Sequence, residues 1–149
     1  MNLKQTIDQD LKQALLGGDK LKSETLRILK SVILNEEIAQ NKRDVGLPDE
    51  EIISCLKKEV KKRQEASELY QKANEVARAK KELDEVKIIN AYLPKAMSDE
   101  DVLMLVNQVV SEIGSDQKFM GKIISEVKAL SKNSADGSQI ARLVKEALR

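Results

Sequence analysis

The sequence predicts an all-α protein, with an N-terminal helical bundle that has a long third helix and a C-terminal three-helix domain. Apolar residues recur at steps of three and four along most of the chain, and no useful length alternates with a period of two. Pro94 ends one helical pattern because proline lacks a backbone N–H, and Ser98 is a typical N-cap for the next. We therefore expect one domain over residues 1–93 and another over 98–149.

The N-terminal domain is expected to begin with two helices. The first has one apolar face, formed by Leu3, Ile7, Leu11, Ala14 and Leu15. The second follows Asp19, which can cap it, and is apolar around most of its circumference over residues 21–38, so we expect it to be central in the bundle. Arg27 lies within this apolar pattern. We expect it to form a buried ion pair with an acid such as Glu36 or Glu37.

The third helical pattern is long, because no glycine or proline interrupts residues 49–93. It forms either one helix or two helices that meet near Asn74. Its middle, residues 61–68, is almost wholly polar, which is typical of a helix that projects into solvent or bridges parts of a structure. Cys55 has apolar neighbours and is expected in the core.

Three shorter helices are expected in the C-terminal domain, over residues 102–113, 120–130 and 140–148. Gly114 is placed to end the first of them. Gly121, near the start of the second, fits either close helix packing or backbone N–H groups offered to a phosphate, and we favour packing.

The absence of histidine excludes several kinds of chemistry. Ser-His-Asp and Cys-His mechanisms and the usual zinc sites all need that side chain. The single cysteine cannot form an intramolecular disulfide. A Ser-Lys or carboxylate mechanism stays formally possible, but no spacing indicates one. We therefore expect no catalytic residues, no metal and no cofactor.

The sequence also favours a cytoplasmic location. The N-terminal residues lack the long apolar region of a secretory signal and carry an early acid at Asp8. No apolar run approaches the roughly 20 residues that span a bilayer. We expect no membrane partner.

Basic residues are unevenly distributed, although the formal net charge is only +1. Residues 57–63 hold five basic side chains and one acid, residues 97–116 are purely acidic, and residues 118–149 are mainly basic. Neutralising a phosphate backbone requires such local positive charge. The candidate RNA-binding residues are Lys122, Lys128, Lys132, Arg142 and Lys145, with Lys61, Lys62 and Arg63. The alternative is an ordinary solvated face, as basic clusters often are.

Aromatic residues are too few to form a stacking platform for single-stranded RNA. They are Tyr70, Tyr92 and Phe119, and Phe119 is expected to lie in the core. A nucleic-acid partner would therefore be a folded RNA that is recognised by its backbone and shape.

Several short segments, in their order and spacing, resemble one family. They are Asp8–Ala14, Gly18–Lys20, Thr25–Lys30, Lys61–Ala66, Leu69–Tyr70, Tyr92–Pro94, Met120–Ile124 and Ala135–Gly137. The chain resembles, over essentially its whole length, the YqeY-like proteins, which are related to the C-terminal tail of the B subunit of tRNA-dependent amidotransferase (GatB). Residues 73–77 depart from the turn that is common in the family, which favours a continuous helix there.

The resemblance implies a two-part helical fold and a tRNA partner, because the corresponding tail contacts the elbow of tRNA and similar domains are fused to a glutaminyl-tRNA synthetase. The family also carries a label of glutamine-dependent carbon–nitrogen ligase activity. Its catalytic machinery lies in other domains and subunits, and this chain has no glycine-rich phosphate loop and no nucleophile–base pair.

Three hypotheses follow, in order of preference. The first is a tRNA-binding accessory module. The second is a protein-interaction adaptor, which would dock on an aminoacyl-tRNA synthetase or an amidotransferase subunit through the long third helix or the acidic residues 99–116. The third is a ligase component of an amidotransferase.

Overall fold

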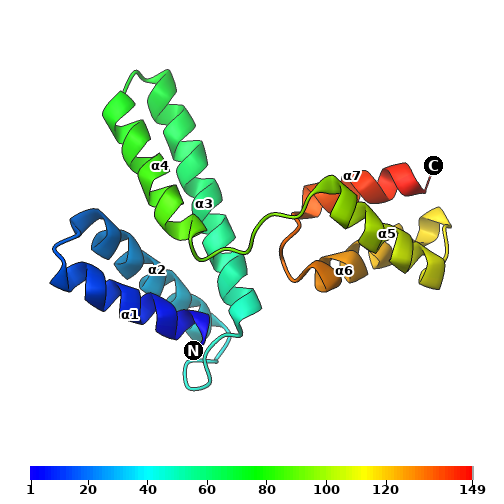
Figure 1. Ribbon diagram of the computed structural model, residues 1–149, viewed down its shortest axis with the longest axis horizontal. Coiled ribbons are helices and arrows are strands. Elements are labelled where there is room, and N and C mark those ends of the chain that lie inside the picture. The colour runs from blue at the N-terminus through cyan, green and yellow to red at the C-terminus, as the bar shows by residue number, and fades with distance from the viewer. Residues whose placement is uncertain (149) are drawn as a thin grey trace. The chain divides into compact units, whose positions relative to one another are not determined.

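The computed structural model describes residues 1–148, and every regular element in that part of the chain is helical (Figure 1). The elements are α1 (Leu3–Leu16), α2 (Lys20–Ala39), α3 (Asp49–Lys72), α4 (Val76–Asn90), α5 (Asp99–Ile113), the 3-10 turn η1 (Gln117–Phe119), α6 (Met120–Ser131) and α7 (Gly137–Ala147). The all-α prediction is confirmed. The chain divides into two compact units, Met1–Leu93 and Pro94–Arg149, and Arg149, which belongs to the basic C-terminal segment, lies outside the described residues.

Two of the predicted helix starts are confirmed by their capping bonds. The Asp19 side chain accepts a hydrogen bond from the Lys22 backbone N–H at 3.2 Å. The Ser98 hydroxyl accepts one from the Asp101 N–H at 3.2 Å, and three acids follow it in the first turn of α5. Each cap satisfies an N–H group that has no partner within its helix.

In the first unit, α2 contacts each of the other three helices, and α1 folds back along it. The shared core is apolar and centres on Ile7, Leu26, Leu29, Ile33, Ile52, Leu56 and Ile89. The expectation that α2 is central in the bundle is confirmed by these contacts, but the apolar residues of α2 are not all buried. Ile28, Leu34 and Ile38 are exposed, because the three neighbouring helices leave part of α2 uncovered.

The third pattern is not a continuous helix; it forms the α3–α4 hairpin. The turn is Asn74, which has φ of 60° and accepts the left-handed conformation more readily than most residues. The Glu75 N–H bonds to the Tyr70 carbonyl at 2.8 Å and the Asn74 N–H to Gln71 at 3.1 Å, the pattern of a Schellman cap. The polar middle of α3 therefore does not project freely, because one side of it packs on α4.

Tyr92 and Cys55 are two further side chains in the first unit whose burial affects their pKa. The Tyr92 hydroxyl, just after α4, donates a hydrogen bond to Asp10 Oδ2 on α1 at 2.5 Å. Burial and this carboxylate raise the pKa of Tyr92. Cys55 lies buried as expected, and burial raises the pKa of its thiol.

In the second unit, α5, α6 and α7 pack against one another around a small apolar core. Its fully buried members are Val102, Val106, Val109, Ile123, Val127, Ile140 and Val144. Phe119 is half-buried against this core, and Lys118 Nζ lies 5.2 Å from the centre of its ring. The packing interpretation of Gly121 is wrong, because a side chain at this position would meet open space.

Candidate nucleic-acid interface

The second unit carries five of the predicted RNA-binding residues, and all five are exposed. Lys122 is near the start of α6, Lys128 is in its last turn and Lys132 is its C-cap. Arg142 and Lys145 are on α7. A helix of 12 residues is about 18 Å long, so the lysines of α6 are distributed along its whole length and do not meet at one point.

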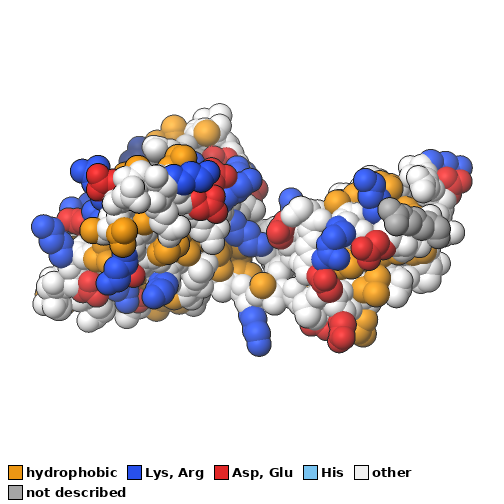
Figure 2. Space-filling view, turned by 90° about the horizontal axis from the view of Figure 1, so that it is seen from above, with side chains coloured by type: hydrophobic (Ala, Val, Ile, Leu, Met, Phe, Trp, Pro, Cys, Tyr) orange, Lys and Arg blue, Asp and Glu red, His pale blue; other side chains and the backbone are white. Residues whose placement is uncertain are grey.

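Four of these side chains carry positive charge that no carboxylate neutralises. Within residues 1–148, the ammonium groups of Lys122, Lys128, Lys132 and Lys145 form no ion pair. Residues 117–148 contain six basic and three acidic residues, so this segment has an excess of positive charge. Figure 2 shows basic and acidic side chains interspersed over the visible face of the unit, with no large area of one sign.

Arg142 differs from the four lysines, because carboxylates hold its guanidinium. Its Nη2 lies 2.8 Å from Asp99 Oδ2, and its Nη1 lies 3.9 Å from Glu146. Gln139 Nε2 donates to Asp99 Oδ1 at 2.9 Å and to the Met97 carbonyl at 3.1 Å. These bonds tie the start of α5 to α7, so the first role of Arg142 is structural.

A shallow depression adjoins this group of bonds. It has a volume of about 520 Å³, and Met120, Ala141, Arg142, Lys145 and Glu146 line it. The start of α6 and the outer face of α7 therefore lie close together at this depression. Lys145 is the lining side chain whose positive charge has no carboxylate partner among the described residues.

The pKa of Asp99 depends on its hydrogen bonds with Gln139 and Arg142. The hydrogen bond from Gln139, and next the one from Arg142, hold it below the ordinary value of 3.8. Because the pKa is lower in the folded state, the stabilisation is present above pH 3.8 and is lost as the pH falls through the folded-state pKa. We expect a carboxyl NMR titration to place Asp99 below 3.8 and Arg142→Ala to raise its pKa, whereas Lys145→Ala leaves it unchanged. A wild-type value at or above 3.8 contradicts the contact.

In the first unit, Arg63 is not a surface residue. Its side chain is 9% exposed, and its Nη1 lies 2.6 Å from Glu59 Oε2 while its Nε lies 3.0 Å from Glu85 Oε2. Burial by itself would lower the pKa of Arg63, but the hydrogen bonds to Glu59 and Glu85 leave it raised. The guanidinium therefore joins α3 to α4 and is not available to a phosphate.

Lys61 and Lys62 do lie on the exposed side of α3. Lys62 is 72% exposed and approaches Glu59 Oε1 at 3.4 Å. Lys58, one turn before Lys62, is also exposed but was not among the candidate residues. Its spacing of three and four residues from Lys61 and Lys62 is the signal that could have added it.

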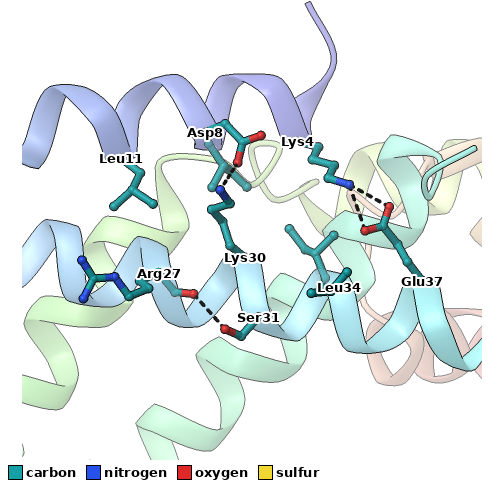
Figure 3. A pocket seen from close by; sticks show the side chains of 10 residues that line it. Lys4, Asp8, Leu11, Arg27, Lys30, Ser31, Leu34 and Glu37 are labelled. Atoms are coloured by element: carbon teal, nitrogen blue, oxygen red, sulfur yellow. Dashed lines mark hydrogen bonds and ion pairs between the residues drawn. The ribbon is translucent and has the colours of Figure 1, made fainter. Parts of the chain in front are cut away.

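A second depression, a groove between α1 and α2, has a volume of about 460 Å³ (Figure 3). Lys4 Nζ lies 2.9 Å from Glu37 Oε1, and Lys30 Nζ lies 3.0 Å from Asp8 Oδ1. The expected pair between Arg27 and Glu36 or Glu37 is wrong. Glu37 is fully buried and pairs with Lys4, whereas Arg27 is exposed at the other end of the groove.

The described residues offer no metal centre, because no three His, Cys, Asp or Glu side chains in that part of the chain could hold an ion together. Cys55 is a poor nucleophile, since burial raises the pKa of its thiol and favours the neutral form. Within residues 1–148 there is also no helix with the length and apolar character needed to cross a membrane.

The fold and the site define a small all-α protein of two helical units with exposed, unpaired lysines. The chain belongs to the YqeY-like family, whose model, described as "Yqey-like protein", matches residues 4–148. It is also similar to "Altered inheritance of mitochondria protein 41, mitochondrial" from Vanderwaltozyma polyspora, at 34% identity over 87 residues. That match covers 58% of this chain and 46% of the relative, so the chain spans under half the length of the curated relative that it matches.

Proposed function

We propose that this protein is a tRNA-binding accessory module, which holds RNA by its phosphate backbone and does no chemistry of its own. The observation that carries the proposal is the set of four unpaired lysines on α6 and α7, namely Lys122, Lys128, Lys132 and Lys145. Lysines that contact phosphates release counterions from the nucleic acid, and this release supplies most of a sequence-independent affinity. Arg142 and Arg63 are omitted from this set, because carboxylates hold both of them.

A folded RNA fits this surface better than a single strand does. Three of the four lysines, Lys122, Lys128 and Lys132, are distributed along α6, which is about 18 Å long, a length that reaches several phosphates of a duplex. Phe119 is half-buried against the core, and one such ring does not form a stacking platform for successive unpaired bases. The relationship of the family to the tail of tRNA-dependent amidotransferase supports tRNA as the folded RNA.

A module that binds RNA without acting on it works beside an enzyme. We propose an aminoacyl-tRNA synthetase or an amidotransferase subunit as that partner, on family relationship alone. Among residues 1–148, no group of three or more His, Cys, Asp or Glu side chains could hold a metal ion for the chemistry of amide transfer.

Binding of an unmodified tRNA transcript, measured from 20 mM to 200 mM KCl in about equal logarithmic steps, tests the proposal. We expect weak binding that falls steeply with salt. Replacing all four lysines with glutamine should weaken binding at least about 100-fold and make the salt dependence about three to four units shallower. The charge-matched control replaces Lys12, Lys20, Lys80 and Lys81, which are exposed elsewhere, and should change the affinity by less than about threefold.

Two results would overturn the proposal. One is no measurable affinity of the wild-type chain for tRNA at the lowest salt concentration. The other is an equal loss in the four-lysine variant and in the control, which would show that total charge and not this surface governs binding. Circular dichroism of each variant confirms that the helices are retained.

A further inference from the structure

The exposed side of α3 is a second concentration of positive charge, and it lies in the first unit. Lys58, Lys61 and Lys62 are exposed within five residues of one another. Residues three and four apart lie on the same side of a helix, so the three ammonium groups project from one side of α3. Leu56 and Val60 are buried and face the core, which leaves the lysines on the solvent side.

The acid within this segment does not cancel the exposed charge. Glu59 lies between the lysines in the sequence, but its side chain is only 8% exposed and its carboxylate lies 2.6 Å from the Arg63 guanidinium. Lys62 is the one exposed lysine that approaches it, at 3.4 Å. Lys58 and Lys61 form no ion pair with any described residue. The next exposed acid of α3, Glu65, lies three residues after Lys62 and four after Lys61, on the same side of the helix, but it forms no ion pair with either lysine.

The buried ion triad of Glu59, Arg63 and Glu85 therefore affects the charge of the surface of α3. Arg63 neutralises Glu59 inside the α3–α4 interface, so the mixed sequence Lys58–Lys62 is almost purely positive outside. An acid is also kept away from the positions where phosphates would approach.

We propose that this α3 lysine face, formed by Lys58, Lys61 and Lys62, binds the phosphate backbone of the same RNA as the second unit. The proposal rests on the proposed function. Lysine is a compact point charge that contacts phosphates without selecting a base, and no aromatic side chain accompanies these three residues. Two weak contacts on one chain strengthen each other, since the second contact becomes an intramolecular step.

The test compares two double variants of the full-length chain against the tRNA transcript. Lys58→Gln/Lys61→Gln removes the two unpaired lysines of the face. Lys12→Gln/Lys20→Gln makes the same change in formal charge on exposed residues of α1 and α2. We expect the α3 variant to bind about tenfold more weakly and to have a salt dependence about two units shallower, whereas the control stays within about threefold of wild type.

Lysine acetylation followed by mass spectrometry gives a second measurement on the wild-type chain, so the conclusion does not depend on how a variant folds. We expect bound tRNA to slow the modification of Lys58 and Lys61 at least about threefold, as for side chains in a phosphate contact, and to leave Lys12 unaffected.

The outcomes separate this inference from the proposed function. If the α3 variant binds like its control, or both lose affinity equally, the α3 lysine face is not a contact, while the second unit can still account for binding. If Lys58 and Lys61 are modified at the same rate with and without tRNA, the inference is also wrong. If the wild-type chain does not bind tRNA at low salt, both proposals fail.

Discussion

Replacing Arg63 with methionine is expected to lower the free energy of unfolding by about 3–5 kcal/mol, a large share of what a small domain has. The guanidinium is bonded to Glu59 and Glu85, whose side chains are 8% and 13% exposed. Without it, two carboxylates remain close together in the α3–α4 interface with no partner of comparable strength. The cost comes mainly from these uncompensated buried charges and only partly from the lost bonds. Denaturant unfolding followed by circular dichroism measures the change.

Two further variants distinguish a charge effect from a packing effect. Lys62 is adjacent to Arg63 in the sequence, and its side chain is 72% exposed. Lys62→Met also removes one positive charge, but it should lower the free energy of unfolding by less than about 1 kcal/mol. The triple change Glu59→Met/Arg63→Met/Glu85→Met removes the whole buried triad and should recover most of the stability. If the triple variant is less stable than Arg63→Met, methionine fails to pack in the interface and the explanation by buried charge is wrong.

The helices of the second unit could be predicted from the sequence because their signals are local. Ser98 is followed by three acids, and Gly114 ends α5 where the apolar pattern stops. Capping and amphipathic periodicity depend on residues that are close together in the sequence, so they predict a helix without knowledge of its tertiary contacts. The division of helices between an N-terminal bundle and a C-terminal group follows from Pro94 in the same way.

The turn at Asn74 could not be predicted with the same certainty. Without glycine or proline, propensity favours a helix straight through residues 73–77. The hairpin forms because α4 then packs along α3, and this tertiary gain exceeds the cost of one asparagine with φ of 60°. Once α4 folds back, the polar middle of α3 becomes an interface, and Arg63 and Ser67 are buried in it.

The candidate binding residues show which properties of a basic residue can be predicted from the sequence and which cannot. Basic side chains can be counted in any segment, but part of the neutralisation of Arg63 and Arg142 comes from acids that are distant in the sequence, beside the local acids Glu59 and Glu146. Asp99 reaches Arg142 from 43 residues away, and Glu85 reaches Arg63 from 22. Neither of these two distant pairings has a local signal, so the ion pairs that hold the two arginines to neighbouring helices could not be predicted from the sequence.

The second large effect on stability concerns the buried acid Glu37. Its partner in the structure is Lys4, whereas the sequence suggested Arg27. Glu37 is fully buried, and Lys4 Nζ lies 2.9 Å from each of its carboxylate oxygens. We expect Lys4→Met to lower the free energy of unfolding by about 3 kcal/mol, since it leaves a buried carboxylate without its cation. The value is at the low end of the range for such pairs, because the Lys4 side chain is itself 39% exposed and water can reach the site.

Arg27→Met is the matched control, because it removes one positive charge from the same groove. Arg27 is exposed at the far end from Glu37, so we expect a change within about 0.5 kcal/mol. Chemical denaturation of both variants under the same conditions decides between the two pairings. A large loss for Arg27→Met with little change for Lys4→Met would mean that the arginine, not the lysine, holds the acid. The double variant Lys4→Met/Glu37→Met should recover stability, because it removes the buried carboxylate together with its cation.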